Sequence, residues 1–126
     1  MKTPRSDSPI TIERNPNRVV VKFNGRTIAD SRSALTLHEA TLPPVLYIPR
    51  SDVDMSLLQR TSHSSHCPHK GDAAYFTIHV DGRSADNAVW TYENPFPAVG
   101  AIKEHVAFYP DRVDAIEERD DTARRM

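Results

Sequence analysis

The sequence lacks the features that mark several large classes of protein. Cys67 is its single cysteine in 126 residues, so no intramolecular disulfide can form. Residues 1–30 hold no apolar stretch of the length that a signal peptide needs, and no apolar run anywhere reaches the roughly 18 residues of a membrane span. We therefore expect a cytoplasmic protein with one free thiol and no membrane partner.

Glycine and net charge are scarce as well. The four glycines form no G-x-G-x-x-G motif and no Walker A loop, which excludes nucleotide binding through those two motifs. The 16 basic and 17 acidic residues nearly cancel, so no overall field attracts nucleic acid. We expect no cofactor and no nucleic-acid partner, and we infer an unknown small molecule as the partner; the oligomeric state stays open.

Short runs of β-branched and aromatic residues dominate the sequence and predict a mainly β fold. Arg18–Phe23 and Arg26–Asp30 flank Asn24-Gly25, the dipeptide that suits a two-residue type I′ turn, so a β-hairpin is expected there. Further strands are expected over residues 34–40, 45–48, 73–80, 87–92, 105–109 and 112–118. The set predicts a small β-barrel or sandwich decorated by helices.

The remaining segments predict helices, loops and tails. Ser51 has the character of a helix N-cap, with a short helix running to Arg60, and residues 98–104 predict one or two helical turns. The polar composition of residues 61–72 predicts a loop. Residues 1–9 and 118–126 are polar or charged and predict flexible tails around one domain over residues 10–117.

The segment Cys67–Phe76, CPHKGDAAYF, combines several chemically active residues. A nearby ammonium or imidazolium, from Lys70 or His66, would stabilise a Cys67 thiolate and favour a nucleophile. Gly71 offers a backbone kink at which amide groups can converge on an anion. The alternative is a buried structural thiol, and the sequence leaves both open.

Glu39 is a second candidate for chemistry. Strand alternation puts it on the same face as the apolar Leu35 and Leu37, and a carboxylate there needs a partner such as Lys70 or Arg50. Either Glu39 transfers protons in a pocket, or it forms a buried ion pair that holds the fold.

A compact cluster of His63, His66, Cys67 and His69 suggests metal binding, because imidazole and thiolate are zinc ligands. Adjacent residues rarely reach one tetrahedral ion together, and the sequence offers no second pair of ligands to complete four. We therefore predict no metal site.

Five segments in a fixed order carry a resemblance to a known family. They are Ile28–Ser31, Tyr47–Val53, Cys67–Phe76, Asn87–Pro95 and Val106–Asp114. Together they resemble an uncharacterised domain-of-unknown-function family of small β-rich proteins with a CPxKGxAxYF-type motif, sometimes labelled nucleotidyltransferase-like. The resemblance implies a tent-like or partly open β-barrel, here of about seven short antiparallel strands with one or two short helices.

With that resemblance, the sequence predicts a small-molecule-binding pocket centred on Cys67, Lys70 and Gly71. The candidate catalytic residues are Cys67, Lys70 and Glu39, and the candidate ligand-binding residues are Tyr47, Arg50, Asp52, Gly71, Tyr75, Trp90, Tyr92 and Glu93. The alternative is a non-catalytic protein-interaction domain. Nucleotidyl transfer and a metal site are less favoured, because the carboxylates and the phosphate cradle that such transfer needs are not evident.

Overall fold

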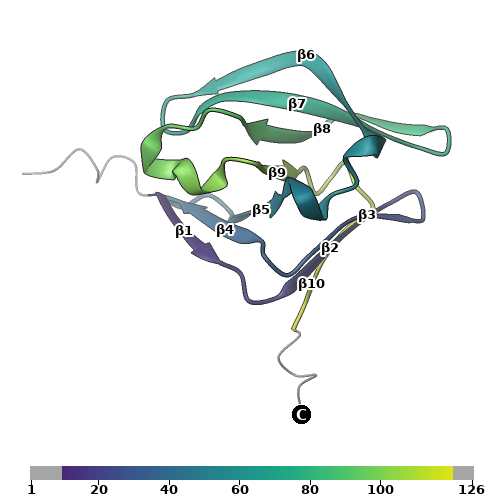
Figure 1. The fold of residues 1–126 in the computed structure, drawn as a ribbon, viewed down its shortest axis with the longest axis horizontal. Coiled ribbons are helices and arrows are strands. Elements are labelled where there is room, and N and C mark those ends of the chain that lie inside the picture. The colour runs from purple at the N-terminus through teal and green to yellow at the C-terminus, as the bar shows by residue number, and fades with distance from the viewer. Residues whose placement is uncertain (1–9, 121–126) are drawn as a thin grey trace, which may run out of the picture.

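The computed structural model describes residues 10–120, which form two antiparallel sheets (Figure 1). The larger sheet has the strand order β1-β4-β5-β9-β8-β7-β6, and the smaller sheet has the order β10-β2-β3. The strands are β1 (Ile10–Arg14), β2 (Arg18–Phe23), β3 (Arg26–Ser31), β4 (Leu35–Glu39), β5 (Val45–Pro49), β6 (Leu58–Cys67), β7 (Gly71–Val80), β8 (Arg83–Tyr92), β9 (His105–Phe108) and β10 (Ala115–Arg119). Three 3₁₀ turns are added, η2 (Arg50–Asp52), η3 (Met55–Leu57) and η4 (Pro97–Ile102).

The prediction of a mainly β, partly open antiparallel fold is confirmed. The long β6–β7–β8 meander lies on one side of the molecule and the β10–β2–β3 sheet on the other, with β5 and β9 between them (Figure 1). The two sheets do not close into a barrel. Ten strands are present among the described residues, more than the predicted number of about seven.

The Asn24-Gly25 hairpin is confirmed. Asn24 and Gly25 have φ angles of 50° and 76°, the pair of positive values that a type I′ turn requires. The flanking strands β2 and β3 pair from Phe23↔Arg26 to Val19↔Ser31, with a bulge after Val21.

The prediction of a loop over residues 61–72 is wrong, because Leu58–Cys67 forms β6 and β7 begins at Gly71. β6 is an edge strand, and most of its side chains are exposed. A strand exposed on both faces needs no apolar alternation, so the hydrophobic signal that identifies half-buried strands is missing.

The short helix predicted from Ser51 to Arg60 is also wrong. The chain makes two 3₁₀ turns, separated by Val53 in an extended conformation that bridges to Ala29 of β3. The Asp54 side chain accepts a hydrogen bond from the Ser56 amide and starts the second turn. The buried Val53 side chain and its bridge therefore outweigh the local capping signal.

The predicted tails fall mostly outside the described residues, which exclude 1–9 and 121–126. Within the described part, β10 extends to Arg119, and Glu118 pairs with Val19 in the ladder. Charged side chains at an exposed strand end do not prevent backbone pairing. No helix among residues 10–120 has the length and apolar character needed to cross a bilayer.

The two faces of the larger sheet carry two separate hydrophobic clusters. Neighbouring residues point to opposite faces of a strand, so Ile48 of β5 joins one cluster and Tyr47 joins the other. The first cluster lies between the two sheets and includes Val19 and Val21 of β2 in the smaller sheet. The second is covered by η4, and it forms the floor of the candidate site.

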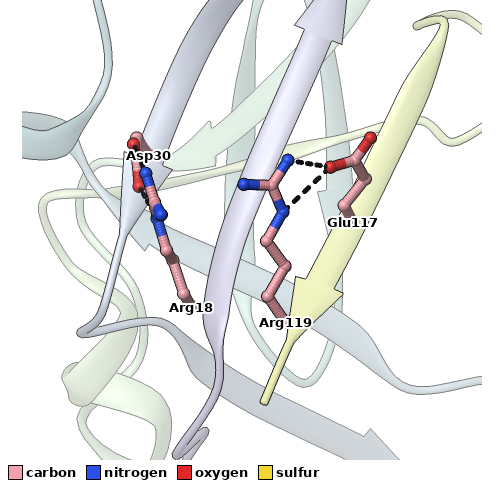
Figure 2. A network of polar contacts seen from close by, with 4 residues as sticks. All are labelled: Arg18, Asp30, Glu117 and Arg119. Carbon is pink, nitrogen blue, oxygen red and sulfur yellow. Dashed lines mark hydrogen bonds and ion pairs between the residues drawn. The ribbon is translucent and has the colours of Figure 1, made fainter. Parts of the chain in front are cut away.

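Ion pairs cover the outer face of the smaller sheet (Figure 2). Arg18 Nε donates to Asp30 Oδ1 at 2.8 Å, and Arg119 Nε donates to Glu117 Oε1 at 3.1 Å. The hydrogen bond from Arg18 lowers the pKa of Asp30. Exposed pairs of this kind contribute little to stability, because water and salt screen the two charges. Asp30 and Glu117 lie on either side of Val20 in the ladder, and Val20 is buried despite facing outward.

Candidate functional site

A cavity of about 240 Å³ lies on the face of the larger sheet that carries the second hydrophobic cluster. The walls come from β4, β5, β7 and β8, the β4–β5 loop, the β6–β7 turn and the residue that follows β9. The residues that line it are Leu37, Glu39, Leu42, Pro43, Val45, Tyr47, Lys70, Tyr75, Trp90, Tyr92 and Tyr109. We call it the aromatic cavity, because five of these residues are tyrosine or tryptophan.

The structure brings together six of the eleven site residues predicted from the sequence: Glu39, Tyr47, Lys70, Tyr75, Trp90 and Tyr92. They come from four strands and one turn, so no local segment contains the site.

Lys70 and Glu39 form an ion pair in the wall of the cavity. Lys70 Nζ donates to Glu39 Oε1 at 2.6 Å, and the two side chains are only 11% and 17% exposed. Lys70 lies in the β6–β7 turn, where its amide donates to the Cys67 carbonyl and its carbonyl accepts from the Phe96 amide. Of the two predicted partners for Glu39, the structure therefore selects Lys70.

The pKa of Lys70 is raised. Burial is the largest influence and lowers the pKa, but the hydrogen bond from Lys70 to Glu39 and the electrostatic effects of Cys67 and Glu39 together outweigh it. Lys70 is therefore an ammonium at neutral pH, which suits a hydrogen-bond donor.

The Lys70 ammonium has donors left for a ligand. Within residues 10–120, Glu39 is its one hydrogen-bond partner, whereas an ammonium carries three N–H groups. The ammonium also lies 5.9 Å from the centre of the Tyr92 ring, inside the range of a cation–π contact.

Contacts among the aromatic side chains fix the walls of the cavity. Trp90 Nε1 donates to Tyr47 Oη at 3.2 Å, and the two rings meet edge to face at 6.3 Å. Trp90 also packs against Tyr109, with 4.5 Å between ring centres. Tyr75 Oη is 2.8 Å from Ser65 Oγ of β6. These bonds orient the rings before any ligand arrives.

Burial also controls the tyrosine hydroxyls. Desolvation raises the pKa of Tyr47 and of Tyr92, and the electrostatic effects of Cys67 and Glu39 add to the increase at Tyr92. Both hydroxyls therefore stay protonated throughout the physiological range, and they act as neutral hydrogen-bonding groups.

These shifts predict a loss of stability at alkaline pH. Lys70, Tyr47 and Tyr92 each have a higher pKa in the folded than in the unfolded chain, where ordinary values are about 10. The folded state then binds more protons than the unfolded state above about pH 10, so their stabilisation is complete below that pH and is lost as pH rises further. Urea denaturation should show a constant free energy of unfolding from pH 7 to 9 and a decline of up to about 1.4 kcal/mol per pH unit and group above pH 10.

The variant Tyr92→Phe provides the control for this prediction, because it removes one titrating hydroxyl and keeps the ring. Its decline above pH 10 should be shallower than that of the wild-type protein. Equal slopes for the two proteins would contradict the assigned pKa shift of Tyr92.

Cys67 and Gly71 lie beside the cavity and do not line it. Cys67 ends β6, is partly buried and packs against the second hydrophobic cluster. Gly71 has a φ angle of +119°, a conformation that side chains strongly disfavour, and a Cβ there would lie 3.3 Å from the Asn94 carbonyl oxygen. The structure thus gives Gly71 a backbone reason for being glycine.

Arg50, Asp52 and Glu93 lie outside the cavity. Asp52 accepts a hydrogen bond from the Ser31 hydroxyl at 2.6 Å and ties η2 to the end of β3. Arg50 lies 5.6 Å from the centre of the Phe76 ring and 3.9 Å from Glu93. All three residues therefore make structural contacts elsewhere.

Glu93 and Gly71 line a groove of about 470 Å³ along β6, separate from the aromatic cavity. Glu93 binds Arg60 there, and this hydrogen bond lowers the pKa of Glu93. His66 lines the same groove and lies 2.7 Å from Asp72. The described residues contain no group of three His, Cys, Asp or Glu side chains able to hold a metal ion.

Sequence reasoning missed five residues that line the cavity: Leu37, Leu42, Pro43, Val45 and Tyr109. The alternation of side chains along the strand predicted over residues 105–109 could have identified Tyr109. It lies two residues after Ala107, so the two side chains point to the same face of the sheet. Leu42 and Pro43 lie in the β4–β5 loop, for which strand periodicity gives no direction.

Comparison with known proteins adds one finding. A family model described as "Domain of unknown function (DUF427)" matches residues 11–119, which include every residue that lines the aromatic cavity. A search among curated proteins found no match.

Proposed function

The chain belongs to the domain-of-unknown-function family DUF427, and from the geometry of the aromatic cavity we propose that this member binds a small, flat, uncharged molecule. The observation that carries the proposal is the buried Lys70–Glu39 pair, with unused ammonium donors, in a cavity walled by five aromatic side chains.

The volume of the cavity limits the ligand to about one ring. About 240 Å³ corresponds to roughly eight water molecules at about 30 Å³ each. Pockets for drug-sized ligands span about 300–1,000 Å³, so the aromatic cavity is smaller than these. The tyrosine and tryptophan walls favour a flat apolar body that replaces this water.

The charges in the wall favour an uncharged ligand over an anion. Glu39 lies 2.6 Å from the Lys70 ammonium and neutralises it, so an incoming carboxylate would meet a nearby negative charge. A cation would meet the Lys70 ammonium. A neutral carbonyl or amide oxygen accepts a hydrogen bond from Lys70 without either cost.

We assign a binding role to each group. Lys70 donates to the ligand, Glu39 holds the ammonium in place, and Tyr47 and Trp90 form an oriented wall. We do not extend the proposal to nucleotidyl transfer, because the cavity wall has one carboxylate, already paired with Lys70, and such transfer needs carboxylates that hold metal ions.

Three single-ring probes of different charge test the proposal. Benzamide should bind with a Kd of about 1 mM, as expected for a neutral ligand of about nine non-hydrogen atoms. Benzoate and benzylammonium should bind at least about tenfold more weakly. The indole N–H resonance of Trp90, the single tryptophan, reports binding in ¹H–¹⁵N NMR titrations. Preference for either ion, or no shift of this resonance with benzamide, would contradict the proposal.

Two exposed apolar residues form a matched pair of variants. Leu42 lines the cavity and is 60% exposed, whereas Phe96 is 40% exposed and lies in the groove along β6. Leu42→Ala should weaken benzamide binding about threefold because a ligand covers part of this side chain. Phe96→Ala should leave the Kd unchanged.

The alternative, a protein-interaction domain, is supported by β6. This ten-residue edge strand is largely exposed and contains no proline or lysine, the residues that often protect sheet edges from pairing. The same titrations separate the two functions, because a domain that binds only proteins through this edge would leave the aromatic cavity without affinity for any probe.

A further inference from the structure

A second cavity, of about 380 Å³, lies between the two sheets and is distinct in character from the aromatic cavity. Its walls include the buried side chains of Val21, Ile48 and Phe108 and the partly buried Ile116 of β10. We call it the inter-sheet cavity. Its volume is within the about 300–1,000 Å³ of ligand pockets, and its walls are mainly apolar.

Polar groups gather at one part of this cavity, around Glu118. The Glu118 carboxylate accepts hydrogen bonds from Asn15 Nδ2 at 3.0 Å and from Asn17 Nδ2 at 3.2 Å. Asn15 is buried and also donates to Thr36 Oγ1 at 3.1 Å. These bonds hold the carboxylate in place beside the apolar walls.

The Glu118 side chain is exposed to solvent at the rim of the cavity and has no close cationic partner among the described residues. Among residues 10–120, no Lys, Arg or His side chain forms an ion pair with it. Its neighbours Glu117 and Arg119 pair with each other on the opposite face of β10, as strand alternation requires (Figure 2). The cavity thus combines apolar walls with one unneutralised carboxylate.

We propose that the inter-sheet cavity binds a cationic amphiphile, with the alkyl chain between the sheets and the ammonium head beside Glu118. The apolar walls account for the chain, because burying each CH₂ group is favourable. Charge complementarity accounts for the head, because an ammonium beside Glu118 supplies the missing cation. This site is independent of the function proposed for the aromatic cavity.

Octylammonium, octanol and octyl sulfate, each below its micelle concentration, test the proposal. Trp90 lines the inter-sheet cavity as well as the aromatic cavity, so its fluorescence reports binding. Octylammonium should bind about tenfold more tightly than octyl sulfate, with octanol between them, since an exposed carboxylate attracts the ammonium and repels the sulfate by about threefold in affinity each. The preference should shrink at high salt. Equal affinities, or tighter binding of octyl sulfate, would overturn the proposal.

Adjacent residues of β10 provide a matched pair of variants. Glu118→Gln keeps an acceptor for Asn15 and removes the charge, and it should reduce the octylammonium affinity about threefold, to about that of octanol, with octanol unaffected. Glu117→Gln removes a charge from the outer face and should change neither affinity. An equal effect of the two variants would assign the preference to general charge and overturn the site.

A third variant locates the alkyl chain. Leu46 lines the inter-sheet cavity and is absent from the walls of the aromatic cavity, so Leu46→Phe should fill the former and reduce binding of all three probes at least about fivefold. Thermal unfolding of the variant verifies that it is folded. Unchanged binding to folded Leu46→Phe would place the chain elsewhere and overturn the proposal.

Discussion

Replacing Glu39 by leucine should lower the free energy of unfolding by about 3–5 kcal/mol, one of the two largest effects that we expect for this protein. The substitution leaves the Lys70 ammonium buried, at 11% exposure, without its hydrogen-bond acceptor. A buried charge without a partner costs far more than an exposed one. Urea denaturation at pH 7 measures the change.

The double variant Glu39→Leu/Lys70→Met should recover most of this loss. Replacing both members of a buried ion pair by apolar side chains of similar size is often neutral, whereas removing one member is not. The exposed pair of Arg18 and Asp30 gives the comparison, and Asp30→Asn should cost no more than about 1 kcal/mol. A double variant as unstable as the sum of its two single variants would show that Glu39 and Lys70 are not coupled.

Replacing Gly71 by alanine should also lower the free energy of unfolding substantially, by about 2–3 kcal/mol. A φ angle of +119° is strained for any residue with a Cβ, and the added carbon would approach the Asn94 carbonyl oxygen to 3.3 Å. The segment from Asn94 to Phe96 must then move, and the Phe96 amide is bonded to the Lys70 carbonyl. Because that shift displaces Lys70, Gly71→Ala should also weaken benzamide binding.

Gly100→Ala is the matched control, measured by the same denaturation experiment. Gly100 lies in η4 without a positive φ angle, and a Cβ there would meet no atom within 4 Å. The alanine should be neutral or slightly stabilising, because it restricts the unfolded chain. Equal costs at Gly71 and Gly100 would contradict the conformational explanation.

Local patterns in the sequence predicted the features that depend on neighbouring residues. The Asn24-Gly25 turn follows from the φ angles that these two residues tolerate. Strand alternation also predicted that Glu39 needs a buried cationic partner, and Lys70 is that partner. Both inferences rest on backbone conformation or burial within one strand, and tertiary contacts did not alter them.

The remaining features depend on contacts that no local pattern contains. β6 is a strand because β7 pairs with it, although its own residues are polar and exposed. Glu93 directly follows Tyr92 at the end of β8, so it points away from Lys70 and into the groove along β6. Arg50 lies 3.9 Å from Glu93 and outside the aromatic cavity. The sequence does not reveal the register between neighbouring strands, so it could not show which side chains share one face of the sheet.

A crystal structure of the protein soaked with benzamide tests whether the Lys70–Glu39 pair holds a neutral ligand in the aromatic cavity. We expect the ring between Tyr47, Trp90 and Tyr92, with the amide oxygen within hydrogen-bond distance of Lys70 Nζ. The folded Glu39→Leu/Lys70→Met variant, soaked in the same way, should show the cavity without benzamide. Benzamide bound elsewhere in the wild-type protein, or bound equally in both proteins, would contradict the role of the Lys70–Glu39 pair.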